Sequence, residues 1–461
     1  MGTAFLESHK EYKEKKDRLA EGLKASQRSD QQKIRLEKAT SNLFRPKIEE
    51  KKDKLLDVKG FNSVIYVDKE RLIAEVEGMT TYESLVEETL KYSCLPTVVP
   101  ELKTITIGGA LSGCGIESSS FRYGLVHETI QDMDILLSNG SVVNCHPSNE
   151  HRDLFYAFPN TFGTLGYALK VTVKLISVKP FVKLTHLHFS DLVSFFSALE
   201  SRSLEGSQDY IEGVIFNHDQ MVITIGEFVD EAPWVSNYRY RNIYYKSLQQ
   251  KEEDYLTTLD YIWRWDPDWF WCSDVFLMQN PLLRLLFGRW MLGSERYGKI
   301  MHYFNRHPQL SAFLDFFNGK RESIIQDISI PIHQSAKFYE FFQREIGIKP
   351  IWICPTKAYS QNERYDFCPM DPSELYLDFG FWKSIPTDQE EGHYNRLLEK
   401  MTTQLGGFKS LYSSSYYTEE EFWSLYDRNR YEQIKEQYDP QRHLRDLYEK
   451  CTIRKSSTQS V

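Results

Sequence analysis

The pattern of hydrophobic and polar positions between residues 62 and 178 predicts short strands joined by turns. NSVIYVD and LIAEVEG flank the polar pair Lys69-Glu70, which predicts a β-hairpin. DMDILLS and SVVNC are joined by Asn139-Gly140, a strong signal for a two-residue hairpin turn. Between Leu169 and Leu175, apolar residues alternate with Lys and Thr, as in a half-buried strand. These runs predict a mixed unit of helices and strands in this part of the chain.

Two capping boxes predict helix starts. Thr80 is followed three residues later by Glu83, and the helix is expected to run through Leu90. Thr418 and Glu421 form the same pattern near the C-terminus, so the tail returns to helix.

A second unit begins near Lys179-Pro180 and mixes strands with aromatic helical stretches. Its expected strands are YIEGVIF, MVITIGEF, ESIIQDISIPI, PIWICP and ELYLDFGFW. Strands interspersed with helices suit a sheet that carries helices on one face. The fold class is therefore predicted to be α+β with two domains.

Three ranges describe the expected domain organisation. Residues 1–54 are charged and helix-favouring and form an arm that contributes to the first domain, residues 55–180 form that domain, and residues 181–461 form a cap with C-terminal helices that return to it. Within the arm, Thr40, Ser41 and Asn42 stand out as small polar residues amid charge.

MQNPLLRLLFGRWML, from Met278 to Leu292, is the most apolar stretch, but Pro281, Arg284 and a glycine interrupt it. We interpret it as a helix that covers the core, with contact to a membrane surface as the alternative. Stretches of about eighteen apolar residues are absent, so a transmembrane helix is not expected. The N-terminus lacks the apolar core of a secretory signal, which predicts a cytoplasmic protein, peripheral to a membrane at most.

Composition narrows the partners. The 461 residues carry a formal net charge of -9, which argues against nucleic acid as a partner. Aromatic residues make up 14% of the chain and favour packed apolar surfaces and flat ligands. The seven cysteines show neither CxxC pairs nor zinc-ligand spacing, so we expect reduced thiols without a metal site. An oligomer is compatible with these features.

Residues 107–124, IGGALSGCGIESSSFRYG, gather five glycines and four serines inside the first domain. Glycines let main-chain N–H groups approach an anion or a planar ring, and serine hydroxyls add hydrogen-bonding groups. The spacing is neither that of a dinucleotide-binding loop nor that of a P-loop. A cofactor site and a packed structural turn both remain open on spacing alone.

Around this loop the chain resembles a known family. PELKTITIGGALSGCGIESSSFRYG, ILLSNGSVV and DLFYAFPNTFGTLGYALKVTVKL resemble the FAD-binding PCMH-type domain of the vanillyl-alcohol-oxidase superfamily. NPLLRLLFG, PIWICP, ELYLDFG and GGFKSLYSSSYYTEEEFWSLYD extend the resemblance to its Δ24-sterol reductase branch and bacterial FAD-linked relatives. It covers most of the chain from about Thr40.

The resemblance implies a set of FAD-binding residues. They are Thr40, Ser41, Asn42, Thr106, Ile107, Gly108, Gly109, Gly113, Gly115, Ile116, Glu117, Ser118, Ser119, Arg122, Tyr123, Gly124, Gly163, Thr164, Leu165 and Gly166. The superfamily has a glycine-rich diphosphate loop N-terminal to this region, and here Thr40-Ser41-Asn42 would take that role. A histidine that matches a covalent attachment motif is absent, so the FAD is expected to be non-covalent.

Several residues carry two interpretations. Glu117 either accepts hydrogen bonds from N–H groups of its own loop or lies near the flavin and tunes a proton. Arg122 is either a structural anchor or a phosphate contact, and His127 is interpreted as a loop histidine with its hydrogen bonds satisfied. YIWRWDPDWFWC packs six aromatic residues around Arg264 and forms either core or an apolar wall for a flat substrate.

Candidate catalytic residues are Glu117, Arg264, and three possible proton donors of the second domain: His333, Tyr376 and Tyr416. The predicted reaction is FAD-dependent reduction of a C=C bond in a sterol-like or other lipid substrate, with NADPH or NADH as electron donor. An alcohol or sugar oxidase or dehydrogenase is the first alternative. A flavin-less lipid-binding or scaffold protein is the second.

Overall fold

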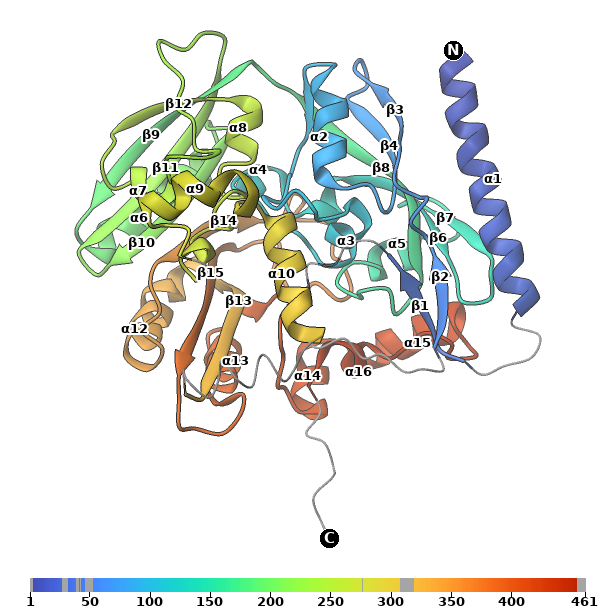
Figure 1. Cartoon of the computed structure of the whole chain (residues 1–461). Coiled ribbons are helices and arrows are strands. Elements are labelled where there is room, and N and C mark those ends of the chain that lie inside the picture. The colour runs from blue at the N-terminus through green and yellow to red at the C-terminus, as the bar shows by residue number, and fades with distance from the viewer. Residues whose placement is uncertain are drawn as a thin grey trace.

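The computed structural model describes residues 3–26, 32–38, 41, 43–45, 53–275, 277–306 and 319–453 (Figure 1). Thr40 and Asn42, two of the expected FAD-binding residues, lie outside these ranges. The described residues form two sheets with helices around them, which confirms the α+β fold class. The cap sheet and the N-terminal sheet lie on opposite sides of Figure 1, with α3 and α10 between them.

The N-terminal unit is built on a sheet with the strand order β3-β4-β8-β6-β7, and β5 also pairs with β8. Its pairings are antiparallel, and the central strand β8 is buried over most of its length. A separate parallel pair, β1 and β2, lies beside it. The strands are β1 (Ile34–Glu37), β2 (Lys54–Asp57), β3 (Val64–Asp68), β4 (Ile73–Glu77), β5 (Cys94–Pro96), β6 (Ile130–Leu136), β7 (Val142–Cys145) and β8 (Tyr167–Ser177).

Helices of this unit surround its sheet and the glycine-rich loop. They are α1 (Thr3–Ser26), α2 (Tyr82–Leu90), α3 (Ile107–Ser112), α4 (Ser120–Tyr123), the 3-10 helix η1 (Val126–Thr129) and α5 (Arg152–Ala157). The long helix α1 is anchored through Tyr12, whose hydroxyl donates to Asp134 of β6 at 2.7 Å. The glycine-rich loop therefore begins as helix α3, inside the unit.

The predicted hairpins are confirmed, and one predicted cap is wrong. At the turn between β6 and β7, Gly140 has φ of +79°, and Asn139 Oδ1 accepts a hydrogen bond from Ser141 N. Helix α2 is capped by Thr81, whose side chain accepts from Ser84 N, and not by Thr80. The hydroxyl of Thr80 instead donates to the carbonyl of Ser63, which directly precedes β3, because Thr80 is buried.

The cap is an antiparallel sheet with the strand order β12-β9-β11-β10-β14-β15-β13-β16. All of the strands expected in this part of the chain are present. The strands are β9 (Phe181–Phe189), β10 (Tyr210–Asn217), β11 (Gln220–Val229), β12 (Glu253–Thr257), β13 (Arg321–Pro331), β14 (Ile351–Lys357), β15 (Leu375–Pro386) and β16 (Phe408–Lys409).

Three helices cover one face of the cap sheet, as predicted: α6 (Leu192–Glu205), α12 (Ser335–Glu345) and α13 (His393–Gln404). Phe195 of α6, Phe338 of α12 and Leu398 of α13 share a core with Ile223 and Phe379 of the sheet. Because side chains alternate along a strand, the neighbouring positions point to the opposite face, toward the N-terminal unit.

The remaining helices lie outside the layer formed by α6, α12 and α13. They are α7 (Tyr244–Ser247), α8 (Thr258–Ile262), η2 (Cys272–Asp274), α9 (Pro281–Met291), α10 (Ser294–Arg306), η3 (Ile332–Gln334), α14 (Glu419–Leu425), α15 (Arg428–Tyr438) and α16 (Leu447–Cys451). The capping box at Thr418 and Glu421 starts α14 as expected. Beyond it the chain runs back to the N-terminal unit, where Lys435 Nζ donates to the Thr164 carbonyl at 2.6 Å.

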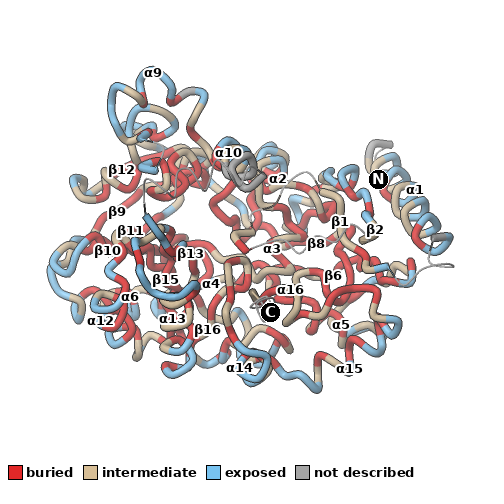
Figure 2. The backbone as a smooth tube through the Cα atoms, turned by 60° about the horizontal axis from the view of Figure 1, so that its bottom comes forward, coloured by how far each residue is buried: buried red, intermediate tan, exposed pale blue. Residues whose placement is uncertain are grey.

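Helix α9 corrects the interpretation of residues 278–292 as a helix that covers the core. It projects from the molecule in Figure 2, and most of its apolar side chains are exposed. The buried face is narrow because Arg284, rather than a leucine, points inward and pairs with Asp268 at 2.6 Å. Within the described residues, every helix is too short or too polar to cross a bilayer.

Candidate functional site

A cavity of about 1210 Å³ lies between the N-terminal unit and the cap sheet. This volume exceeds the range of about 300–1,000 Å³ that is typical of a single drug-sized ligand. We call the cavity-lining residues between Ile34 and Ala168, together with Lys450, which feels the charge of Arg45, the N-terminal wall. Those between Trp269 and Tyr412 are the cap wall. The two walls differ in the atoms that they offer.

Backbone dominates the N-terminal wall at the glycine-rich loop. Thr106 caps helix α3 by accepting a hydrogen bond from Gly109 N. Gly108 N donates to the Gly78 carbonyl at 2.9 Å, and a Cβ on Gly108 would lie 2.7 Å from that carbonyl oxygen. Glycine at this position therefore lets two backbone segments touch beside the cavity.

Non-glycine residues with left-handed backbone conformations also gather here. Cys114, Asn160 and Phe162 have φ of +53°, +63° and +49°, and all three line the cavity. In the cap wall Trp269 and Phe270 have φ of +45° and +60°. Such conformations cost about 1–3 kcal/mol each and cluster at functional sites.

Cationic groups line the same side of the cavity. Arg45 lies over the Phe162 ring, with its guanidinium carbon 4.4 Å from the ring centroid, and donates to the Leu411 carbonyl. Its Nη2 atom and the hydroxyl of Ser41 are buried without a hydrogen-bond partner among the described residues. Burial lowers the pKa of Lys450, which also lines the cavity, to about 7.

The expected FAD-binding residues divide into two groups. Those that line the cavity are Ser41, Thr106, Gly108, Gly109, Gly113, Gly115, Ile116, Gly163 and Gly166. Those that lie behind its wall are Ile107, Glu117, Ser118, Ser119, Arg122, Tyr123, Gly124, Thr164 and Leu165. The first half of the loop thus faces the cavity and the second half does not.

The second half of the loop instead docks the cap. The Ser118 carbonyl accepts from Ile211 N at 2.9 Å, and the Ser118 hydroxyl lies 3.1 Å from that of Tyr261. Arg122 Nη1 donates to the Gln208 carbonyl at 3.3 Å and lies 3.4 Å from an Asp209 oxygen. Of its two interpretations, the structure gives Arg122 the contacts of an anchor.

Glu117 and Arg264, both candidate catalytic residues, meet in a buried ion cluster. Arg264 Nη2 lies 2.9 Å from Glu117, 2.9 Å from Glu212 and 3.3 Å from Glu101. Burial and the Glu117 charge raise the pKa of Glu101 well above its ordinary value, so one carboxyl group keeps its proton. Glu117 accepts from the Ser118 hydroxyl and from Arg264, rather than from N–H groups of its loop.

Aromatic rings form much of the cap wall. Trp269 and Phe270, from the stretch YIWRWDPDWFWC, line the cavity together with Trp352 and Trp382. Phe270 stacks on Trp382 with centroids 4.1 Å apart. The other aromatic residues of that stretch are buried core, so both of its interpretations hold for different side chains.

Two carboxyl groups, Asp327 of β13 and Asp378 of β15, face the cavity within this aromatic wall. Ser329 pairs with Asp378 and Asp327 pairs with Gly380, so both aspartates lie on one face of the sheet. Asp378 Oδ2 accepts from the Ser329 hydroxyl at 2.7 Å. The Oδ1 atom of each aspartate is buried without a hydrogen-bond partner among the described residues.

Protonation of this pair is favoured near neutral pH. Burial raises the pKa of Asp378 to about 7, against the opposing hydrogen bond from Ser329. Burial and the neighbouring Asp378 raise the pKa of Asp327 well above its ordinary value, although the Tyr412 hydroxyl hydrogen-bonds to it. Trp382 Nε1 donates to that Tyr412 hydroxyl at 3.0 Å. Two close carboxyl groups in an apolar site cannot both ionise readily, so the pair holds a proton.

The three proton donors expected from the sequence lie away from the cavity formed by the described residues. His333 is exposed and lies 3.6 Å from Glu374. The Tyr376 hydroxyl accepts from Asp371 N in a small separate core, and Tyr416 is bound through its backbone N–H to Glu399. The expectation that one of them donates a proton at this site is therefore not supported by their positions.

Cys114, Cys368 and His127 come together at the cavity edge, although their spacing in the sequence did not predict a cluster. Cys114 and Cys368 both line the cavity, and their ligand atoms lie within 4.8 Å of each other and of His127. Hydrogen bonds from Cys114 and His127 hold the pKa of Cys368 well below its ordinary value. His127 Nδ1 is buried without a hydrogen-bond partner among the described residues, so this histidine is not fully satisfied.

Residues 15–146 match the model of the family described as "FAD binding domain". The chain carries an FAD-binding domain. It is 29% identical to the human Delta(24)-sterol reductase over 409 residues, which cover 84% of this chain and 75% of the human protein. The Arabidopsis thaliana Delta(24)-sterol reductase is 25% identical over 83% of this chain and 74% of its own length. Cytokinin dehydrogenase 9 of rice is 28% identical, over 31% of this chain and 27% of its own length.

The protein is thus an FAD-linked oxidoreductase that is similar to Delta(24)-sterol reductases over both sheets. The residues of the FAD-binding domain suit an anionic, planar cofactor. The unpartnered Arg45 Nη2 atom and Ser41 hydroxyl suit a diphosphate, and the close backbone approach at Gly108 leaves room for a ring system. Bound FAD supplies hydride chemistry that the side chains themselves lack.

The sequence contained a signal for the aspartate pair in this FAD-linked oxidoreductase. Asp378 lies in ELYLDFG, two residues after Tyr376, and Asp327 lies in QDISIPI, ahead of His333. An acidic residue in a run as apolar as LYLDFGFW is unusual, because charged groups are rarely buried without a partner.

Proposed function

We propose that this flavoprotein reduces a C=C bond of a sterol-like or other lipid substrate with electrons from NADPH or NADH. The observation that carries the proposal is the buried carboxyl pair Asp327 and Asp378, whose unpartnered Oδ1 atoms lie at the cavity within the aromatic cap wall. Reduction of an alkene requires a proton donor at one carbon and a hydride at the other. An apolar wall with one acid suits that requirement.

Each wall has a separate task in this proposal. Ser41, Arg45 and Gly108 of the N-terminal wall hold non-covalently bound FAD, which supplies the hydride. Asp378 donates the proton through its Oδ1 atom, which is free of other partners among the described residues. Asp327, hydrogen-bonded to Tyr412, stays neutral beside Asp378, because burial and the neighbouring Asp378 raise its pKa.

The cap wall also excludes water. Trp269, Phe270, Trp352 and Trp382 cover the surface around the carboxyl pair, so a flat hydrophobic substrate buries apolar area there. Exclusion of water keeps the effective dielectric low and keeps the pKa of the acid raised.

The first alternative, oxidation of an alcohol or sugar, needs a base where this site offers an acid. The similarity to a cytokinin dehydrogenase covers 31% of the chain, and that share is too small to include the cap strands β13 and β15 together with the FAD-binding residues. The carboxyl pair therefore favours reduction over oxidation in the proposal.

The test is a half-reaction assay in D2O with Asp378→Asn. We expect NADPH to reduce the flavin of the variant at the wild-type rate, because the N-terminal wall is intact. Transfer to a sterol alkene should fall about 10²–10⁴-fold, the usual contribution of a general acid. Wild-type product should carry one solvent deuteron.

Glu322→Gln is the matched control, because Glu322 lies on the same strand as Asp327 but outside the cavity. Its transfer rate should stay within a few-fold of wild type. An unchanged transfer rate in Asp378→Asn would refute the assignment of the acid. A failure to reduce any sterol alkene, together with oxygen-dependent oxidation of alcohols, would refute the reductase proposal itself.

Helix α9 supports contact with a lipid surface. Leu282, Leu286 and Trp290 are 71%, 66% and 74% exposed and lie on one side of the helix. The following helix, α10, lines the cavity through Ser294 and Gly298. We propose that α9 rests on a membrane from which a lipid substrate reaches the cavity.

Vesicle flotation tests this contact. Leu286→Glu should lose binding to phosphatidylcholine vesicles, because it places a charge in the apolar face. Val193→Glu is the control, since Val193 is 78% exposed on the distant helix α6. Equal flotation of both variants would contradict a contact through α9.

A further inference from the structure

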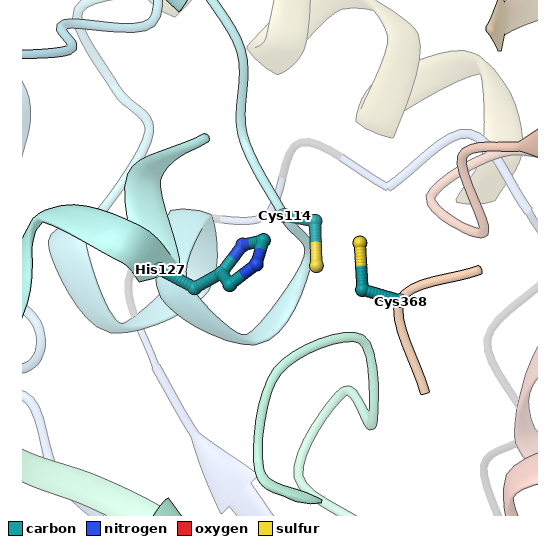
Figure 3. A group of neighbouring side chains, drawn as sticks. All are labelled: Cys114, His127 and Cys368. Carbon is teal, nitrogen blue, oxygen red and sulfur yellow. The ribbon is translucent and has the colours of Figure 1, made fainter. Parts of the chain in front are cut away.

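Three side chains with metal-binding atoms meet at the edge of the cavity (Figure 3). Cys114 follows helix α3, His127 belongs to η1, and Cys368 lies in the connection between β14 and β15. Their sulfur and nitrogen ligand atoms all lie within 4.8 Å of one another. In Figure 3 the Cys114 sulfur lies between the His127 ring and the Cys368 sulfur.

The size of this cluster suits a tetrahedral ion. Zinc–sulfur bonds of about 2.3 Å and zinc–nitrogen bonds of about 2.0–2.1 Å place neighbouring ligand atoms roughly 3.4–3.8 Å apart. Contraction from 4.8 Å or less to this spacing requires shifts of about 1 Å, within the reach of side-chain rotation. Two thiolates and one imidazole favour zinc over the hard cations that prefer oxygen ligands.

The surroundings provide a second, independent observation. His127 is 2% exposed, and its Nδ1 atom has no hydrogen-bond partner among the described residues. A buried polar nitrogen without a partner costs about 1–3 kcal/mol. The ring packs edge-on against Tyr365 with centroids 4.3 Å apart, so its orientation is fixed. The ring hydrogen-bonds to Cys368, but the described protein leaves its Nδ1 atom without a partner, so the hydrogen-bonding capacity of this imidazole is only partly used.

We propose that Cys114, His127 and Cys368 bind one zinc ion whose fourth position opens to the cavity. Cys114 and Cys368 line the cavity and His127 lies behind them, so the free position faces the ligand side. Three protein ligands with one open position is the arrangement of catalytic rather than closed structural zinc sites. A water molecule or an oxygen of a cavity ligand would complete the coordination.

The ion would also join the two units of the molecule. Cys114 and His127 belong to the N-terminal unit, whereas Cys368 comes from a connection between cap strands. Zinc would hold that connection against the cavity edge, because its bonds constrain all three segments at once. This site is independent of the proposed alkene reduction, and it stands if that proposal fails.

The test is the metal content of untagged, reduced full-length protein grown with added zinc, measured by plasma mass spectrometry. We expect about one zinc per chain in the wild type, resistant to gel filtration. Cys114→Ser, Cys368→Ser and His127→Gln should each lose most of it. Cys94→Ser and Cys451→Ser are matched controls, because both cysteines are buried outside the cluster and should leave zinc unchanged.

Cobalt substitution gives a signature that folding defects cannot imitate. The flavin-free protein reconstituted with Co²⁺ should show thiolate-to-cobalt absorption in the near ultraviolet and tetrahedral bands in the visible. Zinc content below about a tenth of an ion per chain would overturn the proposal. A Cys114–Cys368 disulfide found by peptide mass spectrometry in protein purified without reductant would also overturn it, in favour of a redox pair.

Wild-type labelling covers the case in which the variants do not fold. Zinc added to the reduced, metal-free protein should protect two thiols from a maleimide, and a chelator should restore their reactivity. Absence of protection would contradict the site.

Discussion

The two walls of the cavity are built from different parts of the polypeptide. The N-terminal wall offers backbone at Gly108 and Gly109 and cationic side chains such as Arg45. The cap wall offers aromatic rings and the carboxyl pair of Asp327 and Asp378. Backbone amides and cationic groups can bind an anionic cofactor that many enzymes share. Side chains on strands can instead be shaped to one particular substrate. Binding of FAD and choice of reaction are thus separable by mutation.

Next to Asp378→Asn, the largest effect is expected from Arg45→Met, which should weaken the binding of FAD. Methionine keeps an apolar stem over Phe162 but removes the buried guanidinium. Charge-assisted hydrogen bonds contribute about 1.5–3 kcal/mol, so the Kd for FAD should rise roughly 10–150-fold. Flavin fluorescence titration measures it.

Turnover of this variant at saturating FAD should remain near wild type, because the cap wall is untouched. The exposed Arg428 provides the control Arg428→Met, which should bind FAD normally. Equal loss of turnover and affinity in Arg45→Met would break the separation of the two walls.

A second test adds a methyl group to the backbone wall. Gly108→Ala places a Cβ 2.7 Å from the Gly78 carbonyl oxygen, so backbone must move. Overpacking of this kind costs about 1–3 kcal/mol of unfolding free energy, measured by denaturant titration. Gly60→Ala, with no atom within 4 Å of the new Cβ, should change stability by less than about 0.5 kcal/mol. A stable Gly108→Ala protein with normal FAD affinity would show that close backbone approach is unimportant here.

The pH dependence of alkene reduction is a third way to distinguish the cap wall from the N-terminal wall. Asp378, with a raised pKa of about 7, is protonated below pH 7 and loses its proton above it. Alkene reduction at saturating FAD should therefore fall about tenfold per pH unit above 7. By linkage, the stabilising contribution of this carboxyl is lost as pH rises from its ordinary pKa of 3.8 to about 7, and it changes no further above 7. A stopped-flow pH profile measures the reduction, and the decline should vanish in Asp378→Asn.

Lys450 titrates in the same range, but burial shifts its pKa in the opposite direction. Burial lowers its pKa to about 7, so it is charged below pH 7 and neutral above it. FAD affinity should weaken as pH rises past 7, and Lys450→Met should abolish that trend without altering the pH profile of reduction. If one substitution abolished both the pH trend of FAD affinity and the pH profile of reduction, the assignment of these trends to separate walls would be contradicted.

The smallest effect is expected from Trp382→Phe. Phenylalanine keeps stacking on Phe270 but removes the Nε1–H that donates to the Tyr412 hydroxyl. Loss of one hydrogen bond of about 0.5–1.5 kcal/mol, one step from Asp327, should slow reduction roughly two- to tenfold. FAD affinity should not change. A large loss of FAD affinity would contradict the assignment of Trp382 to the cap wall.

The sequence predicts more of the N-terminal wall than of the cap wall, for a physical reason. Residue type alone indicates the backbone role of Gly108, Gly109 and the turn at Asn139-Gly140, so the sequence predicts them. Asp327 and Asp378 come together only when β13 pairs with β15 in one register. Pairing between distant strands is set by the whole sheet, and local patterns do not contain it.

The same limit explains the expectations that were wrong or unsupported. Cys114 and Cys368 are far apart in sequence, so cysteine spacing gave no reason to pair them. Residues 278–292 have the composition of a core helix, and only the inward turn of Arg284 shows which face is buried. His333 lies in η3 just after β13, and Tyr376 lies near the start of β15, but the side chains of both lie away from the cavity.

The buried cluster around Arg264 bears on how such an enzyme can change during evolution. Glu101 and Glu117 come from the N-terminal unit, and Glu212 and Arg264 come from the cap. Without the cap, buried Glu117 would lose the arginine that pairs with it, whereas Arg264 would still pair with Glu212 of its own unit. A cap for a new substrate therefore cannot be grafted as an interchangeable part. It must arise by substitution within the existing cap, with its arginine retained.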